Sequence, residues 1–176
     1  VLTRSEKGAG VARPGLSLVA GNPVQKGRWQ TLVPEQEVII NLAGASIFTR
    51  WTEEAKKSIR ESRLLTTRNL VEAMEGGKVK TFFSTSAIGY YGFHQDEILT
   101  EDCPPGGGFL AQLAQDWEKE AEKGAGKGGR LVITRFGIIL GEKGGALGQM
   151  IRLFKKYLGG PLGRGRQWFS WVHIED

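Results

Sequence analysis

The chain has few of the residues on which metal and redox chemistry commonly depend. Its 176 residues include one cysteine, Cys103, and two histidines. A single cysteine excludes an intrachain disulfide and any metal site built from several cysteines, and it favours a reducing compartment such as the cytoplasm. Cys103 follows the acidic Asp102 and precedes two prolines, so it lacks the electropositive surroundings that make a thiolate reactive.

Long apolar runs are also absent. No apolar segment approaches the roughly 20 residues needed to cross a bilayer, and we recognise no secretory signal. We therefore expect no membrane partner. The chain is instead rich in glycine, with 26 residues, and it carries a formal net charge of +5. These values predict many tight turns and an anionic ligand, for which a phosphorylated cofactor and nucleic acid are both candidates.

Short apolar runs alternate with segments of helical periodicity. Strands are expected at residues 1–4, 16–20, 37–44, 81–84 and 131–136, and helices at 52–75 and 109–123. Thr52 is the expected N-cap of the first helix. The run at 37–44 is continuous, which is typical of a strand buried on both faces of a parallel sheet. This alternation predicts an α/β fold made of βαβ units, in a single domain covering residues 1–176.

The last third of the chain is expected to hold one more helix and one more strand. Leu147, Phe154 and Leu158 are the predicted inner face of that helix, with Arg152, Lys155 and Lys156 on its solvent face. The aromatic segment at 168–174 is predicted to be a buried strand or a sheet edge. The basic residues could attract nucleic acid, but interspersed on an amphipathic helix they are usually a solvated face.

Three hydroxyl residues, Ser84, Thr85 and Ser86, follow the apolar run that begins at Thr81. A strand is expected to end there. Ligands of open parallel sheets bind beyond the carboxyl ends of the strands, so these hydroxyls would face a ligand crevice. The alternative is a Ser/Thr-rich turn whose hydroxyls satisfy only local backbone groups.

Four segments in this order resemble the extended short-chain dehydrogenase/reductases, and more narrowly their atypical branch of epimerase family proteins within the NAD-dependent epimerase/dehydratase superfamily. The segments are SAIGYYG at 86–92, GGALG at 144–148, LGGPLG at 158–163 and WVHIED at 171–176. The resemblance implies a Rossmann-type doubly wound parallel sheet. It also implies that this chain lacks the first βα unit, with its glycine-rich phosphate loop, and the C-terminal substrate-binding part.

The resemblance further implies a nicotinamide cofactor, with NADP favoured over NAD. Arg4 would meet the 2′-phosphate of NADP, where an acidic residue would favour NAD, and Asn22 would contact the adenine. The other implied cofactor-binding residues are Leu42, Ala43, Gly44, Ser84, Thr85, Phe136, Gly137 and Ile138. The alternatives are a solvated arginine at position 4, a turn-forming asparagine at position 22, and close helix packing at residues 42–44.

For catalysis, the resemblance implies that Ser86 hydrogen-bonds the reacting oxygen. The YxxxK pair of related reductases is replaced by Leu110 and Ala114, neither of which can transfer a proton. Tyr90 and Tyr91 are the phenols nearest in sequence, although no positioned cation is evident beside them.

Arg135 could bind a carboxylate or phosphate of the substrate, or it could form a structural ion pair. His94 could relay a proton, although a loop histidine is more often solvated. His173 and Asp176 favour a structural interpretation over a catalytic pair.

Three functional hypotheses follow. The first is an NADP-dependent oxidoreductase or nucleotide-sugar epimerase-like enzyme that transfers hydride at a carbonyl or alcohol carbon of a small-molecule substrate. The second is a catalytically weak protein that binds or senses NADP, which the missing YxxxK pair favours. The third, nucleic-acid binding, lacks any accompanying RNA-binding signature. The helix at 52–75 resembles one that pairs in many dimers of the family, which suggests a homodimer.

Overall fold

The computed structural model describes residues 1–4, 14–127, 129–142, 144–161 and 163–176. Leu162, within one of the four resembling segments, therefore lies outside the described residues. The elements are β1 (Leu2–Thr3), β2 (Val19–Ala20), η2 (Arg28–Leu32), β3 (Val38–Asn41), α1 (Glu53–Ala73), β4 (Thr81–Ala87), η3 (Ile88–Tyr91), α2 (Phe109–Glu122), β5 (Arg130–Phe136), β6 (Ile138–Leu140), α3 (Gly145–Phe154) and β7 (Trp171–His173).

The chain divides into two compact units. Unit 1 comprises Val1–Thr85 and Gln115–Thr134, and unit 2 comprises Ser86–Ala114 and Arg135–Asp176. β4, α2 and β5 each continue from one unit into the other. That the whole chain is one domain stays a prediction.

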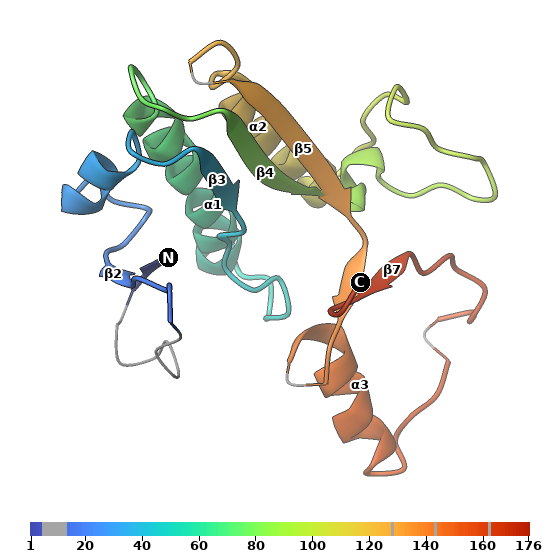
Figure 1. Cartoon of the computed structure of the whole chain (residues 1–176). Helices are drawn as coiled ribbons and strands as arrows, with labels where there is room; N and C mark the ends of the chain where they lie inside the picture. The colour runs from blue at the N-terminus through green and yellow to red at the C-terminus, as the bar shows by residue number, and fades with distance from the viewer. Residues whose placement is uncertain (5–13, 128, 143, 162) are drawn as a thin grey trace. The chain divides into compact units, whose positions relative to one another are not determined.

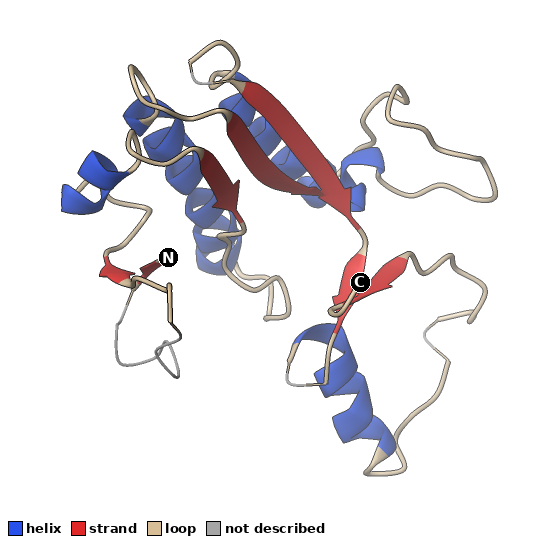
Figure 2. Cartoon of the chain, in the orientation of Figure 1, coloured by secondary structure: helices blue, strands red, loops and turns tan. Residues whose placement is uncertain are grey.

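The sheet of unit 1 is built from β3, β4 and β5, with β4 in the middle. β3 and β4 are parallel, with Val38 opposite Thr81 and Asn41 opposite Ser84. The arrows of β4 and β5 point the same way in Figure 1, as expected for strands joined by a helical crossover. Figure 2 shows α1 and α2 on one face of this sheet. The predicted alternation of strands and helices in a parallel α/β arrangement is confirmed.

The core of unit 1 lies between that sheet face and the helices. Ile39 and Phe82 from the sheet pack in one cluster with Val71 of α1, Met74 at its C-cap and Ala121 of α2. The prediction that the 37–44 run is buried on both faces is wrong, because Ile40 on the opposite face is 62% exposed. The two helices cover one face of β3, so only alternate residues of the strand are buried.

The start of α1 follows the sequence closely. Thr52 is the N-cap as predicted, and its hydroxyl accepts a hydrogen bond from the Ala55 N–H at 3.2 Å. A hydrogen bond from its own backbone N–H, followed by one from the Thr52 hydroxyl, lowers the pKa of Glu54 below its ordinary value. The helix ends at Ala73, three residues before Gly76, which adopts a left-handed φ of 70°.

β4 is longer than predicted. The strand does not end before the hydroxyl residues; it continues to Ala87 and contains Ser84, Thr85 and Ser86. Every second side chain is buried, namely Phe82, Ser84 and Ser86. Serine has a low strand propensity, but β4 is the central strand and pairs with both neighbours, and this tertiary pairing overrides the local preference.

Unit 2 contains a short parallel ladder in which Ile138 lies opposite Trp171 and Leu140 opposite His173. The predicted inner face of α3 is wrong at its C-terminal end. The helix stops at Phe154, and both Phe154 and Leu158 are exposed. The aromatic segment contains a short strand that forms one edge of the two-stranded β6–β7 sheet, with Trp171 exposed, so of the two predicted alternatives the sheet edge is confirmed and the buried strand is not.

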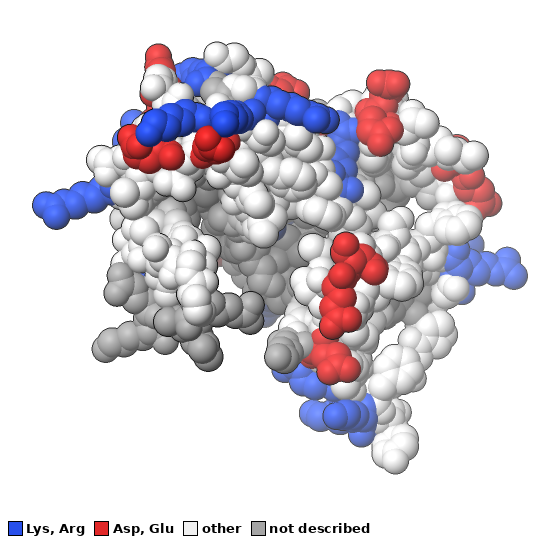
Figure 3. All heavy atoms as spheres, viewed as in Figure 1, with Lys and Arg blue, Asp and Glu red and all other residues white. Residues whose placement is uncertain are grey.

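The charged side chains support the solvated-face interpretation. Arg152, Lys155 and Lys156 are exposed as predicted. Figure 3 shows basic side chains over the lower end of α3 but acidic ones on the same face of the molecule as well. Among the described residues, no helix combines the length and the apolar character that a membrane span requires.

Candidate cofactor and catalytic site

Unit 1 contains a cavity of about 760 Å³ at the carboxyl ends of its strands. β1 and β2 are parallel, with Thr3 opposite Ala20, so their carboxyl ends lie at the same edge. Among the residues that line the cavity are Arg4, Asn22, Leu42, Ala43, Gly44 and Thr66. Five of these six are predicted cofactor-binding residues. The structure thus brings together side chains from the ends of β1, β2 and β3, which is where ligands bind in sheets of this kind.

A buried polar network fixes the end of β3 beneath this cavity. The Asn41 side chain donates to the Thr67 hydroxyl at 2.9 Å, and Trp117 Nε1 donates to the same hydroxyl at 2.9 Å. Asn41 Oδ1 accepts the Ala43 N–H at 3.2 Å, and the Thr85 hydroxyl donates to the Asn41 carbonyl at 2.6 Å. The turn that carries Leu42 and Ala43 is therefore held by buried side chains of α1 and α2, which rigidifies it.

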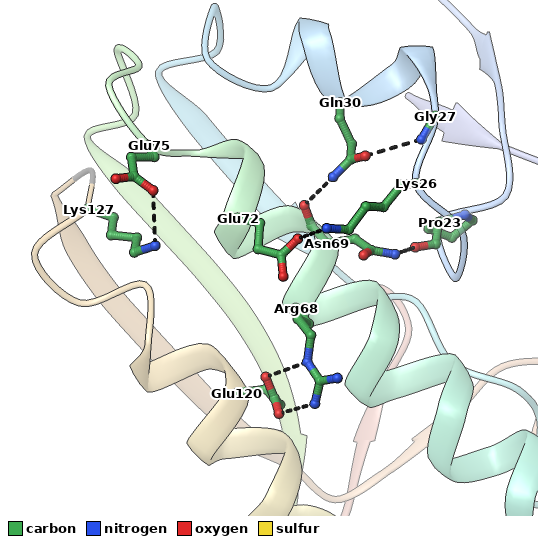
Figure 4. A network of polar contacts seen from close by, with 10 residues as sticks. All are labelled: Pro23, Lys26, Gly27, Gln30, Arg68, Asn69, Glu72, Glu75, Glu120 and Lys127. Atoms are coloured by element: carbon green, nitrogen blue, oxygen red, sulfur yellow. Dashed lines mark hydrogen bonds and ion pairs between the residues drawn. The ribbon is translucent and has the colours of Figure 1, made fainter.

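The turn that carries Asn22 is held by α1 as well (Figure 4). Asn69 Nδ2 donates to the Pro23 carbonyl at 2.9 Å, and the Gln30 side chain donates to the Asn69 carbonyl at 3.0 Å. Asn22 itself accepts the Val24 N–H at 3.2 Å, so it is a turn former in addition to lining the cavity. The ion pair of Lys26 with Glu72, at 2.7 Å, joins the same segment to the helix.

Two buried hydroxyls in unit 1 have no partner among the described residues. They belong to Thr66 and Ser84, each about 1% exposed. Thr66 is one of the residues that line the cavity, although its hydroxyl oxygen is itself buried. Ser84 and Thr85 are not among the lining residues, and Thr85 is used by the Asn41 network. The hydroxyls predicted to face the ligand are thus partly internal, because the strand continues through them.

The candidate catalytic phenols lie in unit 2, in η3. Tyr91 is buried, and its ring meets that of Tyr90 edge-on at 5.3 Å between centroids. The backbone around them is tightly packed. A Cβ at Gly106 would lie 2.1 Å from the Tyr91 carbonyl oxygen, so only glycine fits where Gly106 N donates to the Tyr90 carbonyl. His94 lies 3.0 Å from the Tyr91 carbonyl through Nε2.

Arg135 provides a cation beside these phenols. Its guanidinium donates to the Tyr91 hydroxyl oxygen at 2.7 Å and to the Glu101 carbonyl at 3.1 Å. It also lies over the Tyr90 ring, 3.6 Å from the centroid. The expectation that the tyrosines lack a positioned cation is therefore wrong for Tyr91. The arginine comes from β5, some forty residues away, and sequence spacing gave no sign of the contact.

The remaining predicted residues have clear structural surroundings. Gly137 approaches the backbone of the β7 segment so closely that a Cβ would lie 2.7 Å from the Ser170 carbonyl oxygen. Ile138 donates its N–H to that oxygen at 2.9 Å, and Phe136 ends β5. Ser86 is buried in β4 at 2% exposure. Leu110 and Ala114, at the YxxxK positions, lie in α2, where Ala114 is buried.

Parallel strands with crossover helices and a cavity at their carboxyl ends define a Rossmann-like α/β protein. The chain belongs to the NAD dependent epimerase/dehydratase family, whose model matches residues 1–176.

Curated relatives match most or all of the chain. An Arabidopsis thaliana relative, "Epimerase family protein SDR39U1 homolog, chloroplastic", is 37% identical over 180 residues, covering 100% of this chain and 52% of its own length. The Bacillus subtilis epimerase family protein YfhF is 45% identical over 147 residues, covering 82% of this chain and 48% of its own length. The chain thus spans about half the length of the curated relatives it matches.

Solved structures of the same kind superpose well. The human epimerase family protein SDR39U1 (isoform 2), solved with NADPH, gives a TM-score of 0.77 at 30% identity over 99% of this chain and 57% of its own. A Bacillus cereus UDP-glucuronic acid 4-epimerase, solved with UDP-glucuronic acid and NAD, shares the fold with a TM-score of 0.74 at 18% identity over 90% of this chain and 52% of its own.

Sequence reasoning missed the side chains that support the site from beneath. Thr67, Ser62 and Arg63 lie in the middle of α1 and contact the end of β3 or the turn after it. One signal was present, because Ser62, Thr66 and Asn69 place polar groups among apolar ones on the sheet-facing side of a helix. Buried polar groups require partners, and for Ser62 and Asn69 these are backbone groups of the cavity wall, the Ala45 N–H and the Pro23 carbonyl.

Proposed function

We propose that the protein is an NADP-dependent oxidoreductase or nucleotide-sugar epimerase-like enzyme acting at a carbonyl or alcohol carbon. The observation that carries the proposal is the cavity in which Arg4, Asn22 and the 42–44 turn meet at the ends of parallel strands. Membership of a nicotinamide-dependent family supports it, as does the NADPH complex of the human relative.

The residues present fit such a cofactor. Arg4 would provide the cation, Asn22 a polar amide, and the small residues Ala43 and Gly44 a wall that a ligand can approach closely. Thr66 lines the cavity, and its hydroxyl is buried and unsatisfied among the described residues. A buried donor without a partner costs about 1–3 kcal/mol, so a ligand oxygen that accepted its hydrogen bond would remove that cost.

Preference for NADP over NAD is proposed from the charge at one position. Arg4 directly follows β1 and lines the cavity. A guanidinium recognises a phosphate with two parallel hydrogen bonds, whereas NAD recognition uses a carboxylate to accept from a ribose hydroxyl.

Bound nicotinamide would supply hydride transfer, which the side chains of the chain cannot perform. In this proposal Ser86 holds the reacting oxygen of the substrate by a hydrogen bond. Tyr91, or its neighbour Tyr90, transfers the proton. Arg135 takes the part of the missing lysine, since its guanidinium donates to the Tyr91 oxygen at 2.7 Å and so holds that hydroxyl in place.

A catalytically weak NADP-binding or sensor protein is the second candidate. Leu110 and Ala114 occupy the YxxxK positions, and Tyr91 is mostly buried, which limits its access to a substrate. Both candidates share the cofactor and differ in turnover. We also propose that two copies of the chain form a homodimer through the 52–75 helix. The other proposed partner is a small-molecule substrate, and we expect neither nucleic acid nor a membrane to be bound.

The deciding experiment for the cofactor is calorimetric titration of the natural full-length protein with NADPH and with NADH. We expect NADPH to bind at least tenfold more tightly, and Arg4→Glu to abolish that preference. Arg28→Glu is the matched control, because it makes the same charge change on an exposed arginine outside the cavity lining. Failure of both nucleotides to bind would overturn the proposal.

Turnover separates the two candidates. We expect NADPH oxidation with a panel of carbonyl compounds to fall at least a hundredfold in Ser86→Ala, with NADPH affinity changed less than threefold. Loss of one donor to a developing oxyanion costs about 10²–10³ in kcat. Cofactor binding without turnover in the unaltered protein would establish the binding or sensor candidate instead.

A further inference from the structure

Arg63 of α1 is a partly buried arginine for which the proposed chemistry gives no role. No carboxylate lies within ion-pair distance of it among the described residues, and burial lowers the pKa of its guanidinium. Burying a charge without a counter-charge costs free energy of folding, so a role beyond core packing is expected for Arg63. The neighbouring arginines of the same helix, Arg60 and Arg68, are paired with Asp116 and Glu120 respectively.

The contacts of Arg63 lead to the wall of the cavity. Its Nη1 donates to the Ala45 carbonyl at 3.0 Å and to the Ile59 carbonyl at 3.0 Å. The preceding residue, Ser62, accepts the Ala45 N–H through its hydroxyl oxygen at 2.9 Å. Consecutive residues of α1 therefore hold both the N–H and the carbonyl of Ala45. The guanidinium also lies over the Trp117 ring, with Cζ 5.3 Å from the ring centroid.

Gly44 completes this arrangement. A Cβ built on Gly44 would lie 2.9 Å from Arg63 Cζ and 3.0 Å from Nη2. The guanidinium thus fills the space that a side chain at position 44 would need. Gly44 and Ala45 both line the cavity, so the arginine lies directly behind the wall on which the proposed cofactor would rest.

We propose that Arg63 is a positioning residue for nucleotide binding. It fixes the Gly44–Ala45 wall in two ways: its guanidinium donates a hydrogen bond to the Ala45 carbonyl, and it packs against Gly44 in the space that a Cβ would occupy. This inference rests on the proposed function, and the nucleotide is the anionic dinucleotide assigned there. Pre-organised walls raise affinity because the ordering cost is met in the free protein.

The test compares Arg63→Met and Arg63→Lys in the natural full-length protein. Calorimetry with NADPH gives the affinity, and hydrogen exchange of the Ala45 amide gives the order of the wall without any nucleotide. Arg60→Met is the matched control, since it removes the same charge one turn earlier in α1. We expect Arg63→Met to weaken NADPH binding about tenfold and to speed Ala45 exchange about tenfold. Arg63→Lys should recover part of both, and Arg60→Met should change each less than twofold.

A double-mutant cycle tests whether Arg63 acts on nucleotide binding through its contact with Gly44. Gly44→Ala should weaken NADPH binding in the unaltered protein, because its Cβ displaces the guanidinium. In the Arg63→Met background, which lacks that guanidinium, Gly44→Ala should cost at least threefold less. Equal costs in both backgrounds would contradict the proposal.

Failure of the inference and failure of the proposed function give different results. If the unaltered protein binds no nucleotide, the proposed function fails, and Ala45 exchange alone decides whether Arg63 fixes the wall. If Arg63→Met binds NADPH and exchanges Ala45 like the unaltered protein, the inference is overturned while the function stands. Should Arg63→Met not fold, Arg63→Lys and Ser62→Ala replace it, and unchanged binding and exchange in both would overturn the inference equally.

Discussion

The two units of the chain differ in how their functional residues are supported. In unit 1, large side chains such as Trp29, Ile39, Phe82 and Met74 form a buried core beneath the cavity. Among the described residues of unit 2, the buried hydrophobic ones other than Tyr91 and Leu113 are alanines, at positions 111, 114 and 146. Many of its large apolar side chains are exposed: Phe93, Ile98, Phe154, Tyr157, Leu158, Trp168, Trp171 and Ile174.

This difference matters for function because the cofactor-side residues lie in unit 1 and the candidate phenols in unit 2. The cavity wall is held by buried hydrogen bonds that rest on a packed core. The phenols are held by one arginine and by close glycine contacts, with less apolar burial behind them. Local stability follows buried apolar contacts, so we expect unit 1 to be the more rigid of the two.

The largest expected difference in unfolding free energy between the two units is that between two phenylalanine substitutions. Phe82→Ala removes a side chain that is 2% exposed in unit 1, and should cost about 3–5 kcal/mol of unfolding free energy. Phe154→Ala in unit 2, where the ring is 62% exposed, should cost less than about 0.5 kcal/mol. Urea denaturation measures both. Similar costs would mean that unit 2 has a core as substantial as that of unit 1.

Two adjacent threonines sharpen the account of unit 1. Thr67→Val removes the acceptor of two buried donors, from Asn41 and Trp117, and should cost about 2–4 kcal/mol. Thr66→Val is the matched control, because its equally buried hydroxyl has no partner among the described residues. That change should be neutral or stabilising by thermal unfolding, and should weaken NADPH binding if the cofactor uses the hydroxyl. A Thr66→Val protein as unstable as Thr67→Val would contradict the network described here.

Each unit contains a tryptophan whose indole N–H donates a hydrogen bond to another side chain, and the two can be compared. Trp117→Phe leaves the Thr67 hydroxyl without one donor in a buried setting, and should cost about 1–3 kcal/mol. Trp168→Phe loses the bond from Nε1 to Asp96 at 2.8 Å in an exposed setting, and should cost less than about 0.5 kcal/mol. Chemical denaturation of each variant gives the values, and a larger loss for Trp168 would reverse the ranking of the units.

The smallest expected effect depends on pH. The Arg68 guanidinium lowers the pKa of Glu120, to which it donates at 2.6 and 3.2 Å. Because the folded pKa is below the unfolded one, the contribution is present above about pH 4.3 and is lost as the pH falls through the folded value. Since Arg68 is 45% exposed and Lys123 also contacts Glu120, Arg68→Met should cost only about 1 kcal/mol at pH 7.

That cost should shrink below about pH 4, as measured by urea denaturation at several pH values. Lys78→Met is the control, because it breaks an ion pair with Glu35 in which both partners are exposed. A cost for Arg68→Met that did not depend on pH would show that the arginine stabilises unit 1 through packing instead.

Sequence reasoning predicted the local elements of unit 1 well. The cap at Thr52, the extents of α1 and α2 and the strand at Thr81 follow from hydrophobic period and terminal signals, which are short-range properties. Arg4, Asn22 and Gly44 were predicted as cofactor-binding residues from a resemblance, and the structure places all three on one cavity. Their binding roles stay predictions.

The errors have a common cause. The end of β4, the exposed face of β3 and the exposed Phe154 all depend on which surfaces other elements cover. A strand bearing serines continues where two neighbours pair with it, and an apolar face is buried only where a helix lies on it. Neither fact is encoded in the periodicity of one segment.

By itself, the sequence determined the α/β pattern, the N-cap of α1 at Thr52, and the small residues that end β3, because propensity, capping and period act over a few residues. Only the tertiary structure decided that Arg135 meets Tyr91, that Thr67 joins Asn41 to Trp117, and that Arg63 lies behind Gly44. These contacts join residues 19 to 50 positions apart, and the packing of whole elements sets which distant polar groups can satisfy one another.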